Sequence, residues 1–362
     1  MRHKVQPQNL IPTWLSFSLA AAFVISGLTV TILAYLTVQE MMAAPLNPLD
    51  PILGDGGTNS DGTLPDPGVA TLPPPPSFDE PIVLPEATPL PIYPINDQRV
   101  TILVMGIDRR PGEAFISRTD TMIVMSINPA TNTAAMLSIP RDLYVQIPGF
   151  DRNRINTAFV YGAQGNNPAA GAELAMQTIE YNLGIPIDHY LMVDFSAVVR
   201  GVDALGGIDV DVPFDISDPT FPDMNYGYDP LYIPAGRQHF DGETTLKYVR
   251  TRHVDNDFGR ANRQQQVILA VRNKVMSLGV TQLLGQLPFF YEQLNDGIRT
   301  DLSLDQMLTL VQAASEIPQE NIRTEVIDYD YVVSHQTEQG ASVLIMVNER
   351  VAPLIAELFY DN

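Results

Sequence analysis

The sequence of 362 residues contains no cysteine. Disulfides, zinc–thiolate sites and thiol catalysis are therefore excluded, and cysteine usage leaves the redox compartment undecided. Basic residues are scarce as well, with 21 Lys and Arg against 42 Asp and Glu, a formal net charge of −21 at pH 7. Such a surface repels phosphate backbones, which argues against a general nucleic-acid-binding protein.

Several motifs of well-known enzyme classes are also missing. The sequence has no P-loop, no GxGxxG and no GxSxG elbow. Its five histidines show no HExxH or other ligand spacing, which argues against a zinc site. His253, beside Arg252, is interpreted as a structural neighbour rather than as a catalytic base.

One uncharged stretch lies near the N-terminus. Residues 14–38 are 25 consecutive residues without a charge, long enough to cross a bilayer as a helix. Arg2 and Lys4 precede this stretch, and the next basic residue is Arg99. The positive-inside rule therefore predicts a single-pass signal-anchor helix in the cell membrane, with residues 1–13 cytoplasmic and the remainder extracellular. A cleaved signal peptide is the alternative, although its apolar region would normally be shorter.

Proline is concentrated directly after this stretch. Residues 45–96 hold 14 of the 30 prolines, together with glycines and scattered acidic residues. Such a segment cannot bury enough apolar surface to offset its chain entropy. We therefore predict a Pro/Gly-rich extracellular linker at 39–98, which holds a folded domain at 99–362 away from the membrane. A passive linker is the alternative interpretation.

Three apolar segments predict the beginning of a sheet. Residues 99–108, 121–129 and 133–139 each have the pattern of a buried strand. If they are antiparallel neighbours, the end of the first, the start of the second and the end of the third share one edge. Four polar residues would then converge there: Asp108, Arg118, Asp120 and Arg141. A parallel first pair would separate them, although the loop of residues 108–120 is short for a crossover helix.

The rest of the domain alternates helix and strand. A helix is predicted at 171–184, then a strand, a short helix and a strand between 186 and 213. Further helices are predicted at 304–315 and 347–359. We therefore expect an α/β domain built on a central mixed, largely antiparallel sheet.

An arginine-rich stretch, residues 248–268, is unusual in so acidic a chain. Residues 245–253 have strand character, which would project Arg250 and Arg252 from one face. Gly259 is interpreted as a turn, followed by a helix that Gly279 stops. The helical phase places Arg260, Arg263 and Gln264 in line with the apolar stripe, and Asn262, Gln265, Gln266 and Asn273 on the solvated side. Gln266→Ala is accordingly expected to have little effect.

The inward direction of these arginines predicts an anion site. A solvated charge run is the common alternative, but unpaired buried guanidinium groups cost several kcal/mol. Asp255 and Asp257 could neutralise two of them, and the remainder would bind an anion with the help of the helix N-terminus. Guanidinium groups suit pyrophosphate, and Asp108 and Asp120 suit Mg²⁺, although both could be loop-capping residues. Together these features favour phosphoryl transfer.

These residues together resemble the LytR-CpsA-Psr family of cell-wall glycopolymer transferases. The matching segments are VMGIDRR, SRTDTMIVMSINP, LSIPRDLYV and RINTAFVYG, followed by IDHYLMVDFSAVVRGVDALGGIDVDV and AGRQHFDGETTLKYVRTRHVDNDFGRANRQQQVI. The resemblance is strong over residues 99–278. Arg154 stands where the family often has lysine, and FVYGAQG lacks the usual double glycine; neither departure touches the carboxylates or the paired arginines.

The resemblance implies a Mg²⁺-assisted phosphotransferase, with Mn²⁺ as the alternative ion. Its donor would be a glycopolymer on a polyprenyl-pyrophosphate carrier and its acceptor a peptidoglycan hydroxyl, joined through a phosphodiester. The implied fold is a three-layer α/β/α domain with an apolar pocket for the lipid tail. The implied metal ligands are Asp108 and Asp120. The implied pyrophosphate-binding or catalytic residues are Arg118, Arg141, Arg154, Arg250, Arg252, Asp257, Arg260 and Gln264.

Two other functions share this pattern. A hydrolase would cleave polyprenyl pyrophosphate with water as the acceptor, at the same site. A non-enzymatic membrane-anchored regulator or wall-binding module would keep the fold, but its metal and arginine positions would be expected to decay. Because these positions are present, the transferase is favoured.

Overall fold

The computed structural model describes residues 89–90, 99–109, 113–223, 227–252, 254–279 and 286–360. The chain divides into two units, residues 1–70 and 71–362, and all described residues belong to the second. The predicted helix at 14–38 and most of the predicted linker therefore lie outside the described residues. Among the helices that are described, none is both long and apolar enough to span a membrane.

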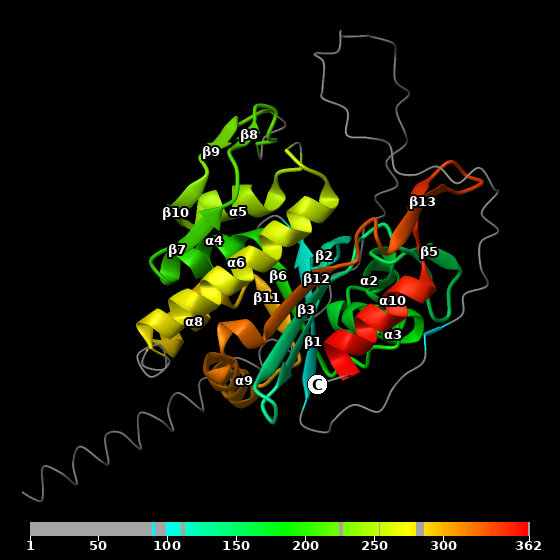
Figure 1. Ribbon diagram of the computed structural model, residues 1–362, viewed down its shortest axis with the longest axis horizontal. Coiled ribbons are helices and arrows are strands. Elements are labelled where there is room, and N and C mark those ends of the chain that lie inside the picture. Colours follow the sequence, from blue (N-terminus) through cyan, green and yellow to red (C-terminus); the bar gives the residue numbers. More distant parts are fainter. Residues whose placement is uncertain are drawn as a thin grey trace, which may run out of the picture. The chain divides into compact units, whose positions relative to one another are not determined.

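A six-stranded mixed sheet forms the centre of the described unit (Figure 1). Its strands, in spatial order, are β11 (Ile298–Thr300), β6 (His189–Asp194), β1 (Val100–Ile107), β2 (Thr119–Asn128), β3 (Thr133–Ser138) and β12 (Ile322–Val326). Strands β1, β2 and β3 are antiparallel neighbours, as predicted, and β11 is antiparallel to β6. The β1–β6 and β3–β12 pairs are parallel, so the sheet is mixed.

The register brings the predicted strand ends to one edge. Ile107 at the end of β1 pairs with Thr119 at the start of β2, and Ile123 of β2 pairs with Ser138 at the end of β3. Gly106 is needed at this edge because a Cβ there would lie 2.9 Å from the Thr121 Cβ. The residues that flank these positions, including Asp108 and Asp120, therefore lie at the same end of the three strands; we call this end the sheet edge.

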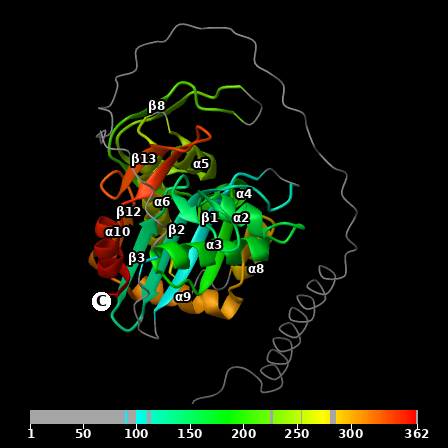
Figure 2. The same cartoon turned by 90° about the vertical axis from the view of Figure 1, so that its right-hand side faces the viewer.

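Helices cover both faces of the sheet (Figures 1 and 2). One face packs against α2 (Thr157–Gly162), α3 (Pro168–Leu183) and α10 (Asn348–Ile355), which continues into a π-helical turn, η2 (Ala356–Tyr360). The other face carries α4 (Phe195–Ala204), α6 (Asp257–Leu278), α8 (Leu287–Leu294) and α9 (Leu304–Glu316). The predicted three-layer arrangement is therefore present in the described unit.

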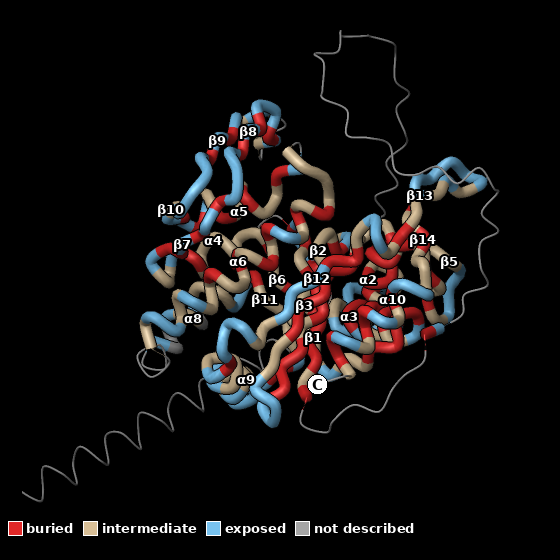
Figure 3. Tube along the Cα trace, viewed as in Figure 1, coloured by how far each residue is buried: buried red, intermediate tan, exposed pale blue. Residues whose placement is uncertain are grey.

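The main core follows the period of two along the strands. Leu103 and Met105 of β1 and Met122 and Val124 of β2 are buried in one cluster with residues of α3 and α10. Buried residues are concentrated along the central strands (Figure 3). A second, smaller core lies beneath β7 (Ile208–Val212), β8 (Ile216–Asp218), β9 (Leu231–Ile233), β10 (Gly236–Phe240) and α5 (Gly242–Arg250). The remaining elements are β4 (Tyr144–Gln146), β5 (Arg152–Arg154), η1 (Gln319–Asn321), β13 (Val332–Gln336) and β14 (Ser342–Met346).

The strand predicted at 245–253 is wrong, because residues 245–250 belong to helix α5. Asp241 caps the helix by accepting a hydrogen bond from the Thr244 amide at 2.8 Å. Glu243 and Lys247 form an i,i+4 ion pair at 3.1 Å along its surface. The β-branched and aromatic residues predicted a strand, but the cap and the helical spacing of buried residues decide the outcome.

Helix α6 confirms the predicted stop at Gly279, which lies at a positive φ of 82°. Its start differs, because Asn256 caps the helix by accepting from the amides of Phe258 and Gly259. Gly259 is therefore not a turn but part of the first helical turn. A Cβ at this position would collide with the carboxylate of Asp255, which explains the glycine.

The predicted solvated side of α6 is only partly correct. Asn262 and Asn273 are exposed, but Gln265 is 4% exposed and donates to Ser138 Oγ at 2.8 Å and to the Glu325 carbonyl at 2.7 Å. Gln266 accepts a hydrogen bond from the Tyr248 hydroxyl at 2.6 Å. The helix packs on two sides, against the β3 and β12 strands and against α5 and β7, and both sides include polar contacts.

We predict that Gln265→Ala lowers the free energy of unfolding by about 1–3 kcal/mol, because it leaves a buried hydroxyl and a carbonyl without their donor. Urea denaturation of the two variants Gln265→Ala and Asn262→Ala measures the difference. The control Asn262→Ala changes an exposed side chain of the same helix and should stay within about 0.5 kcal/mol of wild type. Equal stabilities for the two variants would contradict the burial of Gln265.

Candidate active site

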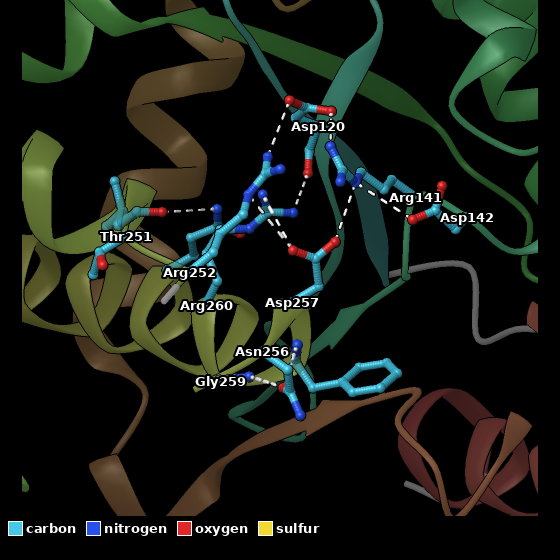
Figure 4. A network of polar contacts seen from close by, with 12 residues as sticks. Asp120, Arg141, Asp142, Thr251, Arg252, Asn256, Asp257, Gly259 and Arg260 are labelled. Carbon is cyan, nitrogen blue, oxygen red and sulfur yellow. Dashed lines mark hydrogen bonds and ion pairs between the residues drawn. The ribbon is translucent and has the colours of Figure 1, made fainter. Parts of the chain in front are cut away.

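Arg141 joins the sheet edge to the N-terminus of α6 (Figure 4). Its Nη1 donates to Asp120 Oδ1 at 2.8 Å, and its Nε donates to Asp257 Oδ2 at 3.1 Å. Asp120 is the second residue of β2, Arg141 follows β3, and Asp257 is the first residue of α6. One guanidinium therefore bridges two carboxylates from separate elements.

Two further arginines contact the same carboxylates. Arg252 lies 3.3 Å from Asp120 Oδ2 through Nη2 and 3.5 Å from Asp257 Oδ1 through Nε. Arg260 donates to the Asp120 backbone carbonyl at 3.0 Å, and its Nη1 lies 3.7 Å from Asp257 Oδ1. Three guanidinium groups thus surround two carboxylates, which leaves the cluster with a positive excess.

The electrostatic environment differs among these arginines. Burial lowers the pKa of Arg260 to about 10, with the Asp257 carboxylate acting in the opposite direction, so the group stays charged at neutral pH. For Arg141, burial also acts to lower the pKa, but the hydrogen bond to Asp120 and the charges of Asp120, Asp257 and Asp142 raise it overall. A bound anion would relieve the unfavourable burial of Arg260.

A small cavity lies within the cluster. Its volume is about 20 Å³, and its lining includes Asp120, Arg141, Asp257, Arg260 and Gln264. This space holds about one water molecule. A pyrophosphate group would therefore have to bind at the open side of the cluster, where the Arg252 side chain is 40% exposed. The apolar pocket that the family resemblance implies for a lipid tail stays a prediction.

Asp108, Arg118 and Arg250 border this cluster. Asp108 and Arg118 are exposed and lie directly beside the paired residues Ile107 and Thr119 at the sheet edge. Arg250 ends α5, and burial lowers its pKa, with the Asp108 carboxylate opposing this shift and the Arg252 charge adding to it. The predicted convergence of strand ends is confirmed, whereas contact of each residue with a ligand stays a prediction.

Arg154 lies one ion pair farther from the cluster. Its Nε is 3.2 Å from Asp142 Oδ1, and its Nη2 donates to the Ser342 carbonyl at 2.6 Å. The same Asp142 carboxylate lies 3.6 Å from Arg141 Nε. Arg154 therefore reaches Arg141 through Asp142. Asp142 was not among the predicted site residues, although its place next to Arg141 in the sequence points to it.

Arg263 points inward as predicted, but its guanidinium binds other groups of the protein and stabilises the fold. Its guanidinium donates to the carbonyls of Tyr248, at 2.9 Å, and Thr251, and it pairs with Asp255. The Thr251 hydroxyl donates to Asp218 Oδ2 at 2.6 Å. These contacts fix the segment between α5 and α6, which carries Arg252.

Metal binding by Asp108 and Asp120 stays a prediction. No group of three or more His, Cys, Asp or Glu side chains that could hold a metal occurs within the described ranges. Mg²⁺ typically takes one or two protein carboxylates plus substrate phosphates, so two carboxylates are the number that such an ion requires. In the structure, the Asp120 carboxylate contacts Arg141 and Arg252.

The fold and the site together define a class. A mixed sheet whose strand ends bring several arginines together presents the planar charged donors that phosphate-containing ligands favour. The chain belongs to the LytR_cpsA_psr family, whose model matches residues 86–359.

Individual relatives agree with this assignment. The polyisoprenyl-teichoic acid–peptidoglycan teichoic acid transferase TagU of Oceanobacillus iheyensis is 36% identical over 214 residues, which are 59% of this chain and 62% of that protein. The corresponding transferase TagV of Bacillus subtilis is 33% identical over 229 residues, 62% of this chain and 55% of that protein. The chain therefore spans less than two thirds of the length of either relative.

Solved structures show the same fold. The crystal structure of TagV from B. subtilis has a TM-score of 0.56 and 28% identity, covering 73% of this chain and 98% of that chain. A structure of TagT bound to LI-WTA has a TM-score of 0.56 and 26% identity, covering 72% of this chain and 90% of that chain.

We predict that Arg141→Ala and Arg154→Ala differ strongly in their effect on pyrophosphate binding. Removing Arg141 deletes a charged donor and leaves Asp120 and Asp257 to repel the anion, so the Kd should rise by about 10- to 100-fold. Removing Arg154 breaks a partly exposed ion pair, and its effect should stay below about fivefold. Calorimetric titration with inorganic pyrophosphate measures both values. Equal losses would place Arg154 in direct contact with the ligand.

Proposed function

We propose that this chain is a membrane-anchored extracellular phosphotransferase. It moves a glycopolymer from a polyprenyl-pyrophosphate carrier to a peptidoglycan hydroxyl and joins them through a phosphodiester. The observation that carries this proposal is the cluster of Arg141, Arg252 and Arg260 over Asp120 and Asp257, in a chain of this family. Relatives named as teichoic acid transferases support the donor and acceptor classes.

The chemistry follows from the charges of the cluster. The donor pyrophosphate takes the place of the carboxylates against the arginines, which neutralise the charge that develops on the transferring phosphoryl group. The acceptor oxygen attacks the phosphorus that carries the glycan, and the bond from this phosphorus to the bridging oxygen breaks. Polyprenyl phosphate leaves, and a carboxylate released from the arginines, such as Asp257, is placed to accept the hydroxyl proton.

The membrane arrangement is part of the proposal. A helix at residues 14–38 would anchor the chain in the bilayer that holds the lipid-linked donor, and residues 39–98 would act as the spacer. The domain would then work on the outer side, where the acceptor lies. No nucleic-acid partner is proposed, because the net charge of −21 disfavours one.

Mg²⁺ completes the proposed site, with Mn²⁺ as an alternative. Asp108 and Asp120 would hold the ion together with the pyrophosphate oxygens, and the ion would supply further neutralisation of phosphate charge. Arg118 and Arg250, at the same edge, would contact the phosphates.

Arg250→Ala and Arg252→Ala should each lower turnover by about 10²–10³-fold, because each removes a fixed donor to the developing charge. The assay is formation of the glycan–peptidoglycan adduct from lipid-linked glycan by the full-length chain. The matched control is Arg237→Ala, since Arg237 is a surface arginine of β10 that is 79% exposed and pairs with Asp209. Near wild-type turnover in the first two variants would reject the site. Phosphate release without adduct would instead identify a hydrolase.

Chelation with EDTA should abolish adduct formation, and added Mg²⁺ should restore it, because the pyrophosphate charge is otherwise incompletely neutralised. Asp108→Asn should raise the Mg²⁺ concentration needed for half-maximal turnover. Asp215→Asn serves as the control, because this exposed carboxylate contacts Tyr232 and Ala235 in the β8–β9 region. Undiminished turnover in EDTA would remove the metal from the proposal.

A further inference from the structure

Three arginines near the candidate site, Arg250, Arg109 and Arg299, pack against aromatic rings. The guanidinium carbon of Arg250 lies 4.6 Å from the centroid of the Phe195 ring and 5.4 Å from that of Phe221. The guanidinium carbons of Arg109 and Arg299 lie 4.1 Å and 4.4 Å from the centroid of the Phe115 ring. A cation over an aromatic face is attracted by the ring quadrupole, and it is also restricted in direction.

We propose that the junction of β6 and α4, Asp194–Phe195, is a positioning device for the active site. Phe195 places the guanidinium of Arg250, and Asp194 places Asp108 through Arg109. The inference rests on the proposed function, because it assigns Arg250 and Asp108 to the reaction. Neither junction residue touches the cluster of Arg141, Asp120 and Asp257 in the described contacts.

The junction lies beside the end of β1, because β1 and β6 pair in parallel. Ile107 pairs with Asp194, so Asp108 and Phe195 leave the sheet from the same rung of the ladder. The junction is therefore a direct backbone neighbour of the strand end that carries Asp108, on the side opposite to β2. Its position is set by the pairing of β6 in the central sheet.

The junction also forms a buried ion pair. Asp194 is 1% exposed and its Oδ2 lies 3.4 Å from Arg109 Nε, while Arg109 is 9% exposed and donates from Nη1 to the Asp296 carbonyl at 3.1 Å. The other oxygen of Asp194 caps α4 by accepting from the Ala197 amide at 2.8 Å. Separating a buried pair leaves an uncompensated charge, so Arg109 and the adjacent Asp108 backbone cannot move independently of α4.

Helix α4 is in close contact with α5. A Cβ on Gly242, the first residue of α5, would collide with the backbone of Val199 in α4. The two helices therefore approach more closely than side chains would allow. Because Phe195 begins α4 and Arg250 ends α5, this contact fixes the ring relative to the guanidinium.

Phe115 and Arg299 belong to the same set of positioning contacts. Phe115 lies on the β1–β2 connection, in the half that is nearer to β2. Phe115 is 4% exposed, and its two cation contacts join it to the β1 end and to β11. Arg118 follows only three residues later. The Phe115 ring therefore contacts Arg109, the residue after Asp108, on the same connection that carries Arg118.

The test is a double-mutant cycle on the full-length chain, read by calorimetric binding of inorganic pyrophosphate. Phe195→Met keeps the volume but removes the aromatic face, and it should weaken binding by about 3- to 30-fold, the range that cation–π contacts span. Phe195→Tyr keeps the ring, and its hydroxyl can reach solvent from a half-buried site, so binding should recover to within twofold. In an Arg250→Ala background, Phe195→Met should have no further effect, because the ring acts through Arg250.

The control is Phe214→Met, which changes a ring that is 45% exposed and should leave binding unchanged. If Phe195→Met weakened pyrophosphate binding by the same factor in the wild-type and the Arg250→Ala backgrounds, the positioning role would be overturned. Phe221→Met, which removes the other ring against Arg250, gives an independent cycle if Phe195→Met does not fold. A wild-type chain that does not bind pyrophosphate would overturn the proposed function and this inference together, whereas additivity would overturn only the inference.

Discussion

The bridge from Arg141 to Asp120 and Asp257 is the interaction on which the rest of the site depends. It joins a strand of the central sheet to the first residue of α6, two elements that have no backbone hydrogen bond in common. The Arg252 contacts to both carboxylates and the hydrogen bond from Arg260 to the Asp120 carbonyl reinforce the same connection. The relative position of the strand ends and the N-terminus of α6 is therefore set by several guanidinium groups, of which Arg141 makes the two shortest contacts to the carboxylates.

The burial of charge explains why so many polar contacts gather here. Arg260 is 6% exposed, and the loss of hydration is offset only in part by Asp257 and the Asp120 carbonyl. Arg263 is more fully compensated, because each of its guanidinium nitrogens contacts a carbonyl or Asp255. The two residues lie about one helical turn apart, and the contacts of Arg263 fix the segment between α5 and α6.

Strand periodicity predicted the part of the site that lies on the sheet. The buried runs of β1, β2 and β3 place Asp108, Asp120 and Arg141 at one edge, because antiparallel order follows from short connections. The helix α5 was not predicted, since its β-branched and aromatic residues favour a strand and only the Asp241 cap argues otherwise. The burial of the Gln265 side chain was not predicted either, because a polar side chain that faces polar partners does not add to the hydrophobic pattern of the sequence. The roles of Asp194 and Phe195 depend on contacts between segments far apart in the chain, which no local pattern records.

Asp120 and Asp257 form ion pairs with the arginines of the site. Under the proposed function, an anion that approaches from the open side by Arg252 and binds the same arginines would therefore have to compete with these carboxylates. A singly charged anion would offer no more charge than the carboxylate with which it competes. An anion with several charges at short spacing would compete with both carboxylates at once, and release of Asp257 would supply a base beside the phosphorus. Ligand selection and proton acceptance would thus be two outcomes of the same competition.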